Sequence, residues 1–295
     1  MEFKIKILFL VGLLIPAVST AAVPRDDLID GVSQKPVTLE KIVSSVQAGG
    51  VLIISEQHGN LKHHHRQTET LQELQKTGRC TVSVGLEFLH WPFQDATSKY
   101  LAGSLSEADF LKAVEWGSDP FANYRDQARF PSVTGGELRA INAPSKLTHT
   151  ISQQGLASLA PELQAMMPPN FQLGRADYRE RFEEVMGQHV PPQALDNYFA
   201  AQSTWDETMA WQAHDFLASH PTHCLAIIVG DFHAAWGGGL PDRLRARGVS
   251  NVVVISQLET DGATDAELQP EIEPHSRYGV RADAIWLSSK SISSP

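Results

Sequence analysis

Four short apolar runs constrain the fold of this chain more than any other feature. They are rich in β-branched residues and do not alternate with polar ones, which is typical of strands buried on both faces of a parallel sheet. The runs are Val51–Ile54, Val82–Leu86, Leu225–Val229 and Val252–Ile255. Helical stretches lie between them, as in an α/β fold. The sequence therefore predicts a mostly parallel central sheet flanked by helices.

Weaker patterns add elements to this sheet. Leu138–Asn142 is a fifth strand candidate, and Ala284–Leu287 is predicted to be a last strand near an edge. Hydrophobic spacing predicts helices over Leu61–Lys76 and Phe110–Trp116. The acidic, turn-rich stretch 261–276 is predicted to be a loop.

The interval from about residue 145 to 220 shows helical periodicity and no convincing strand. We expect a helical insertion that covers the carboxyl ends of the strands. If the helix containing Gln202 and Asp206 is this lid, both side chains could face the strand ends, although its aromatic stripe is more often simply core. Residues 23–295 are then one α/β domain.

The first 22 residues resemble an export signal, with Lys4 and Lys6 before a short apolar core and small residues at positions 19–22. No cysteine follows at the cleavage region, because the first in the chain is Cys80. We therefore expect a soluble periplasmic protein without a lipid anchor. Its formal charge of −10 argues against nucleic acid as a partner.

The chain has two cysteines, Cys80 and Cys224, and each begins an apolar run. If the two runs are adjacent parallel strands in register, a disulfide could join them in an oxidising compartment. Two buried free thiols are the equally acceptable alternative at this stage.

Acids and histidines follow the predicted strands, at the edge where open α/β sheets bind ligands. They are Glu56 and His58 after the first strand, Glu87 after the second, and Asp231 and His233 after Leu225–Val229. Residues two apart in an extended segment point the same way, so each carboxylate-imidazole pair could face one site. Glu56, His58, Glu87 and His233 are candidate metal ligands, with Glu56 or Glu87 as the base of a metal-dependent hydrolase. The alternative is that these side chains only cap helices and satisfy backbone amides.

Two other motifs carry weaker signals. In a helix, His63, His64 and His65 would point about 100° apart, so at most two can reach one ligand. The run Gly237–Gly239 would let the backbone approach a phosphate, a propionate or a flat ring. The P-loop, GxSxG, HExxH and CxxCH patterns do not occur, which removes the common nucleotide, serine hydrolase, zincin and covalent haem assignments.

The motifs together resemble the ChaN family of haem-binding uptake proteins, in the superfamily that includes Tiki proteases and erythromycin esterases. The resemblance spans about residues 36–288 and rests on SEQHGNLKHHHRQ, VGLEF, YRDQARF, LRAINAPSKL, AQSTWDETMA, VGDFHAAWGGGLPDRL and ADAIWL. It matches Glu56, His58, Glu87 and the element from Gly230 to His233, whereas Asp231 is outside the matched pattern.

The resemblance implies an exported protein that binds haem for iron uptake, through a tyrosine on iron and cationic residues on the propionates. Tyr124, in the matched YRDQARF segment, is the predicted iron ligand, because a phenolate suits ferric iron. Lys62 with His63 or His64 is the predicted cationic rim for the propionates. The resemblance further implies a haem-linked homodimer and supply by an outer-membrane haem receptor system. A hydrolase with a divalent metal ion remains the alternative function.

Overall fold

The computed structural model describes residues 22–289 and contains one seven-stranded sheet with helices on both faces. The strand order is β1-β7-β6-β2-β5-β3-β4, and every neighbouring pair is parallel except β1 with β7. The strands are β1 (Leu28–Asp30), β2 (Val51–Glu56), β3 (Thr81–His90), β4 (Leu138–Asn142), β5 (His223–Gly230), β6 (Val252–Glu259) and β7 (Ala284–Ser288). The predicted mostly parallel α/β fold is confirmed.

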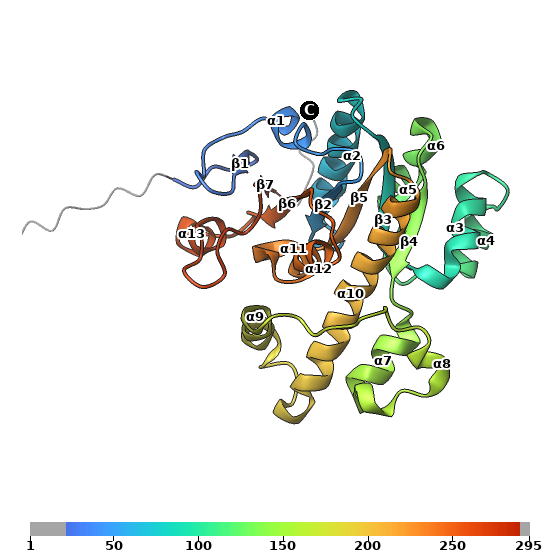
Figure 1. Ribbon diagram of the computed structural model, residues 1–295. Coiled ribbons are helices and arrows are strands. Elements are labelled where there is room, and N and C mark those ends of the chain that lie inside the picture. Colours follow the sequence, from blue (N-terminus) through green and yellow to red (C-terminus); the bar gives the residue numbers. More distant parts are fainter. Residues whose placement is uncertain (1–21, 290–295) are drawn as a thin grey trace, which may run out of the picture.

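The α-helices occupy the connections between these strands (Figure 1). They are α1 (Leu39–Val43), α2 (Leu61–Lys76), α3 (Gln94–Leu101), α4 (Glu107–Ala113), α5 (Arg125–Arg129), α6 (Pro131–Thr134), α7 (Ser145–Gln154), α8 (Pro161–Gln164), α9 (Ala176–Met186), α10 (Leu195–Ser219), α11 (Asp231–Ala234), α12 (Leu240–Ala246) and α13 (Asp265–Ile272). No helix within residues 22–289 is long and apolar enough to cross a membrane.

The two faces of the sheet carry separate apolar clusters. Along β2, Leu52 and Ile54 belong to the cluster under α1, α2 and α4, whereas Val51 and Ile53 belong to the cluster under α10, α12 and α13. This alternation within a continuous apolar run follows from the period of two in a strand. The central strands are therefore buried on both sides, as their composition predicted.

The helical insertion between β4 and β5 contains α7, α8, α9 and α10. Helix α10 packs its carboxyl-terminal half on the sheet through Met209 and Phe216, and its amino-terminal half carries Ala200 and Ala201 against α7 and α8. In Figure 1, α10 runs from the sheet to the lower part of the molecule, where α7, α8 and α9 gather. The insertion is thus fixed beside the carboxyl ends of the strands.

Three details differ from the sequence expectation. Stretch 261–276 is not only loop, because Thr264 and Glu267 form a capping box that begins α13. Helix α4 is capped by Ser106 and ends at Ala113, earlier than the predicted Trp116. The three-residue strand β1 was not anticipated, since so short a run has no readable period.

A disulfide joins Cys80 to Cys224 across β3 and β5. The two strands are parallel neighbours as the prediction required, but Val82 rather than Cys80 lies opposite Cys224, so the two cysteines are offset by two residues. Of the two alternatives, the structure contains the bridge and the described residues include no free cysteine.

Candidate functional site

The predicted polar side chains meet at the carboxyl ends of β2, β3 and β5, which are adjacent in the sheet. Glu56 is the last residue of β2, and His233 lies in α11 directly after β5. Glu87 lies within β3 rather than after it, next to a shift in the β3–β4 register between Leu86 and His90. The side chains form two hydrogen-bonded groups, one on each side of the sheet end.

The first group surrounds the carboxylate of Glu56, which is only 1% exposed. Its Oε1 atom accepts hydrogen bonds from Tyr124 (2.5 Å) and lies 2.7 Å from His58 Nδ1. Its Oε2 atom accepts from Gln67 at 2.6 Å and lies 3.4 Å from His64 Nδ1. Burial alone would raise the pKa of Glu56, but these neighbours hold it below its ordinary value.

Tyr124 is completely buried behind this carboxylate. Burial and the adjacent Glu56 carboxylate raise the pKa of its phenol, so the hydroxyl stays protonated and donates a hydrogen bond to Glu56. In this arrangement Tyr124 presents no oxygen to an external iron atom. Its assignment as the iron ligand stays a prediction, and binding to iron would require the hydrogen bond to Glu56 to break.

The side chains of the predicted cationic rim contact other groups of the protein. His63 is fully buried, and burial lowers its pKa to about 4; His64 is 5% exposed, and burial lowers its pKa as well. Both rings are thus neutral near pH 7. Lys62 points to Asp26, with 3.7 Å between Nζ and Oδ1. As expected, the three consecutive histidines diverge, and His65 faces solvent.

His58 connects the first group to solvent, because its side chain is 44% exposed. The hydrogen bond to Glu56 raises its pKa and fixes the ring through Nδ1. A Cβ atom at Gly230 would lie 3.3 Å from His58 Nε2 and 3.4 Å from Glu87 Oε2. Gly230 therefore leaves room for the two side chains to approach each other at the end of β5.

The second group is centred on His233, which is 6% exposed. Its Nδ1 atom lies 2.7 Å from Asp206 and its Nε2 atom 3.4 Å from Glu87. Tyr178 donates to the other oxygen of Asp206 at 2.8 Å, and Gln202 donates to the Tyr178 hydroxyl at 3.0 Å. Asp206 and Gln202 thus face the strand end from α10, as the lid hypothesis required.

The charges in this second group depend on one another. Burial would lower the pKa of His233, but Asp206 and Glu87 raise it to about 10. Burial would likewise raise the pKa of Glu87, but His233 and His58 lower it to about 2. An imidazolium between two carboxylates is therefore the stable state near neutral pH.

Asp231 does not join His233, contrary to the predicted second carboxylate-imidazole pair. Both residues lie in α11, where positions two apart point in different directions. Asp231 instead accepts from Ser55 and Ser256, each at 2.6 Å, and pairs with Arg281. Asp231 thus links β2 and β6 to the connection between α13 and β7.

The glycine run 237–239 lies against the side chain of Tyr178. A Cβ atom at Gly238 would come within 2.9 Å of Tyr178 Cβ, and one at Gly239 within 2.9 Å of the Tyr178 hydroxyl. These glycines let Tyr178 pack closely enough to reach Asp206. Nothing local in the sequence shows that Tyr178 pairs with Asp206.

The four predicted metal ligands do not assemble around one point. Within residues 22–289, no group of three or more His, Cys, Asp or Glu side chains is placed to hold a metal ion. Glu56 and His58 bond to each other, and His233 is saturated by Asp206 and Glu87. The metal-site hypothesis is not supported.

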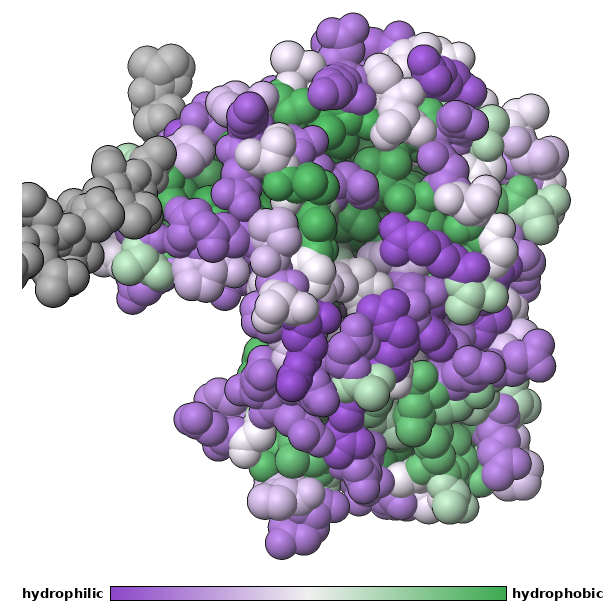
Figure 2. All heavy atoms as spheres, turned by 60° about the vertical axis from the view of Figure 1, so that its left-hand side comes forward, coloured by the Kyte–Doolittle hydropathy of each residue, from purple (hydrophilic) through white to green (hydrophobic). Residues whose placement is uncertain are grey.

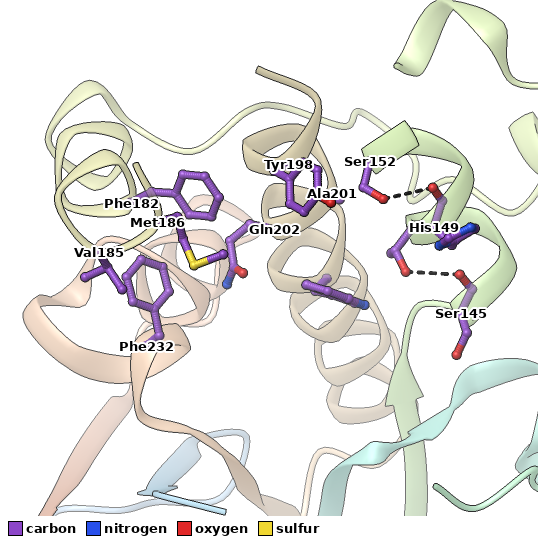
Figure 3. Close-up of a pocket in the computed structure, with 12 residues that line it drawn as sticks. Ser145, His149, Ser152, Phe182, Val185, Met186, Tyr198, Ala201, Gln202 and Phe232 are labelled. Atoms are coloured by element: carbon purple, nitrogen blue, oxygen red, sulfur yellow. Dashed lines mark hydrogen bonds between the residues drawn. The ribbon is translucent and has the colours of Figure 1, made fainter. Parts of the chain in front are cut away.

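An apolar cavity of about 540 Å³ lies next to the second group. Helix α10 contributes Tyr198, Gln202 and Trp205 to it, and the Trp205 ring lies edge-on to His233 with 6.2 Å between centroids. Figure 3 shows residues of α9 and α11 on one side of α10 and residues of α7 on the other. The first side carries Phe182, Val185, Met186 and Phe232, and the second carries Ser145, His149 and Ser152.

The surface around the insertion is mixed in character. Figure 2 shows apolar side chains reaching the surface in the lower part of the molecule, between hydrophilic ones. Val185, at the rim of the cavity, is 50% exposed. A cavity of this size with few polar groups is typical of a site for a small organic ligand or cofactor.

Comparisons with known proteins identify related sequences and folds. The sequence matches the family model described as haem-binding uptake, Tiki superfamily, ChaN over residues 42–244. No curated protein matches it. ChaN of Campylobacter jejuni, for which cofacial haem binding is described, has a similar structure with a TM-score of 0.63 and 16% identity, covering 88% of this chain and 95% of that one.

More distant folds include erythromycin esterase EreC in its open conformation, with a TM-score of 0.46 and 11% identity over 88% of this chain and 82% of that one. The type III effector HopBA1 gives a TM-score of 0.44 and 14% identity over 83% of this chain and 90% of that one.

Proposed function

This chain belongs to the ChaN family of haem-binding uptake proteins in the Tiki superfamily, and on that premise we propose that it binds haem outside the cytoplasm as part of haem or iron acquisition. The observation that carries the proposal is the apolar cavity of about 540 Å³ between α7, α9, α10 and α11. Flat apolar cofactors require such a lining, with few polar groups to orient them.

Tyr198 is the proposed iron ligand in this cavity. The chain has five tyrosines, and Tyr100, Tyr124 and Tyr178 are at most 2% exposed. Tyr278 lines a different cavity, whereas Tyr198 is half-buried and lines this one. An accessible phenol can release its proton to water when it binds a ferric ion, for which a phenolate is a suitable ligand.

Other lining residues suit the remaining parts of a haem. Phe182, Met186 and Phe232 offer an apolar wall for the macrocycle, and His149 and Ser152 offer polar groups for propionates. When bound, haem supplies the iron and the absorption spectrum by which binding is followed. The protein's part is to exclude water from the macrocycle and to hold the iron through Tyr198.

Export and assembly belong to the same proposal. The Cys80–Cys224 disulfide favours an oxidising compartment, in agreement with the signal-like segment 1–22. Val185 at the cavity rim favours closure of the pocket by a second copy, and a haem-linked homodimer would bury it. An outer-membrane haem receptor system would then be the source of the cargo.

A haem titration tests the proposal. We expect ferric haem added to residues 23–295 to give a saturable tyrosinate-type spectrum, and Tyr198→Phe to abolish that spectrum. Tyr124→Phe is the matched control and should keep it. Light scattering of the same samples should report a dimer only with haem. Loss of the spectrum in Tyr124→Phe but not in Tyr198→Phe would reverse the assignment, and no saturable change would reject haem binding.

Hydrolysis is a second candidate function, and the arrangement of His58 favours it. This imidazole is half exposed and held by a buried carboxylate, which is how a general base is oriented. We expect a metal-free preparation to hydrolyse an activated ester if this site is catalytic, and His58→Ala to remove the activity. His65→Ala, on the exposed side of α2, is the control. Activity that depends on a bound metal, or that survives His58→Ala, would contradict it.

A further inference from the structure

The backbone nitrogen of Val23 lies against a carboxylate that is far away in the sequence. It donates to Asp265 Oδ2 at 3.2 Å, and Arg25 donates to the other oxygen, Oδ1, at 2.7 Å. Asp265 is in the first turn of α13. The two oxygens thus hold two different groups of the amino-terminal segment.

Val23 is buried near the amino-terminal end of the described residues. Val23 is 5% exposed and belongs to the apolar cluster that also contains Leu268 and Ile272 of α13, whereas Ala22 is exposed. Two further hydrogen bonds fix the segment, from Arg25 to the carbonyl oxygens of Thr260 and Ala263. Within residues 22–289, the first buried residue is therefore the one that follows the predicted cleavage region.

Cleavage between Ala22 and Val23 would change the charge of the docked nitrogen. Hydrolysis of the Ala22–Val23 peptide bond adds a hydroxyl group from water to the Ala22 carbonyl carbon and leaves the nitrogen on Val23 as an amine. That amine takes up a proton at neutral pH, because α-amino groups titrate near 8. A neutral N–H donor to Asp265 becomes an ammonium group.

We propose that removal of residues 1–22 places an α-ammonium group at Val23 against the Asp265 carboxylate, and that this ion pair anchors the amino terminus of the exported protein to α13. The proposal rests on the export proposed above. The amide nitrogen is already in position, so the new charge requires no rearrangement of the chain.

The strength of the pair follows from its exposure. The Asp265 side chain is 47% exposed, and removal of Ala22 opens the ammonium group to water on one side. Half-exposed ion pairs contribute modestly, and Arg25 on Oδ1 leaves Oδ2 available to the terminus. The anchor is therefore a small, measurable increment that depends on where the chain begins.

Three forms with defined termini test the anchor. One begins at Val23, one is the same chain acetylated on the α-amine, and one begins at Ala22, which moves the charge by about 3.5 Å. We expect the Val23 form to unfold about 1–3 °C above the other two. In Asp265→Asn versions, we expect the three forms to have equal melting temperatures, because the carboxylate that interacts with the α-amine is absent. Comparing the two sets of forms separates the interaction of Asp265 with the α-amine from its interaction with Arg25. Equal melting temperatures of the three forms with Asp265 present would overturn the ion pair.

Cleavage between Ala22 and Val23 is tested by a separate measurement. The intact mass of protein exported from cells should correspond to a chain that begins at Val23. A different terminus would overturn the cleavage position, and retention of residues 1–22 would reject the proposed export. Both results are independent of the melting temperatures, which are measured on chains with termini set by preparation, and of the haem titration.

Discussion

At the scale of single residues, Glu56 governs the properties of its neighbours. Its buried carboxylate keeps the Tyr124 phenol protonated, orients His58 toward solvent and accepts from Gln67 on α2. A buried carboxylate is tolerated only when several donors satisfy it. Each donor is therefore needed for stability, whether or not it takes part in ligand binding.

Removing the Tyr124 hydroxyl tests this role. Tyr124→Phe takes a 2.5 Å hydrogen bond from a carboxylate that is 1% exposed, so we expect it to lower the free energy of unfolding by about 1–3 kcal/mol. Tyr198→Phe removes the same group from a half-buried ring and should cost less than about 0.5 kcal/mol. Urea unfolding of both variants measures the difference. Equal stabilities would show that Tyr124 does not support Glu56.

The imidazolium of His233 should depend on Asp206. Asp206→Asn keeps the shape of the side chain but removes the nearer of two negative charges, so the pKa of His233 should fall from about 10 by at least about 1 unit. NMR titration of the imidazole protons measures it. Asp215→Asn is the control on α10, because its carboxylate is exposed and contacts His214. An unchanged pKa in Asp206→Asn would assign the shift to Glu87 instead.

Among the helices and strands, the sequence predicted those whose bounds are determined by local patterns. The bounds of α2 and the burial of Leu71 and Leu74 follow from helical periodicity and the stop at Gly78. The short helix α13 was missed, because Pro270 and an acidic composition obscured the capping box at Thr264. Elements with many periodic residues were predictable, and elements fixed by one cap or by tertiary contact were not.

The loop before α12 should tolerate no side chain at Gly238. A methyl group there would lie 2.9 Å from Tyr178 Cβ, closer than real Cβ contacts allow. We expect Gly238→Ala to cost about 1–3 kcal/mol and to weaken the Tyr178–Asp206 contact. Gly117→Ala is the control, since nothing lies within 4 Å of the added carbon. Circular dichroism melting curves distinguish them, and similar curves would contradict the close packing.

At the scale of the whole molecule, the candidate site joins residues that are far apart in sequence. Glu56, Glu87 and His233 could be assigned to one edge because parallel strands end together. For Asp206 of the insertion the sequence indicated only that it could face the strand ends, and its pairing with His233 and Tyr178 depends on how α10 packs against the sheet. Sequence reasoning therefore placed the strand-end members together, but it did not show that Asp206 of the insertion pairs with His233.

The disulfide links these parts across the chain. Cys80 and Cys224 are 144 residues apart, so the bridge restricts the unfolded chain strongly. The double substitution Cys80→Ser and Cys224→Ser should lower the free energy of unfolding by about 2–4 kcal/mol. A thiol reductant should destabilise the natural chain by a similar amount and leave the double variant unchanged. No effect of reductant would mean that the bridge is not formed in the protein.

The pH dependence of stability should show a maximum near pH 6.5, because two buried histidines are shifted in opposite directions from that value. The pKa of His233 is raised to about 10, so the folded protein binds its proton more tightly than the unfolded chain does. Its contribution is complete below about pH 6.5 and is lost as the pH rises toward 10. The pKa of His63 is lowered to about 4 by burial, so the unfolded chain binds that proton more tightly and stability falls from pH 6.5 toward 4. The pKa of Glu87, about 2, adds a further loss below its ordinary value of 4.5.

Each arm of this profile can be assigned to its residue by substitution. A single linked proton changes the free energy of unfolding by up to about 1.4 kcal/mol per pH unit. His63→Gln should make the acid arm between pH 4 and 6.5 shallower, with His64 retaining part of the slope, and His233→Gln should make the alkaline arm shallower, with His58 retaining part of it, even if both lower the stability at the maximum. Melting temperatures in buffers across this range give the slopes. An alkaline slope in His233→Gln equal to that of the natural chain would show that the imidazolium between Asp206 and Glu87 does not produce the alkaline arm.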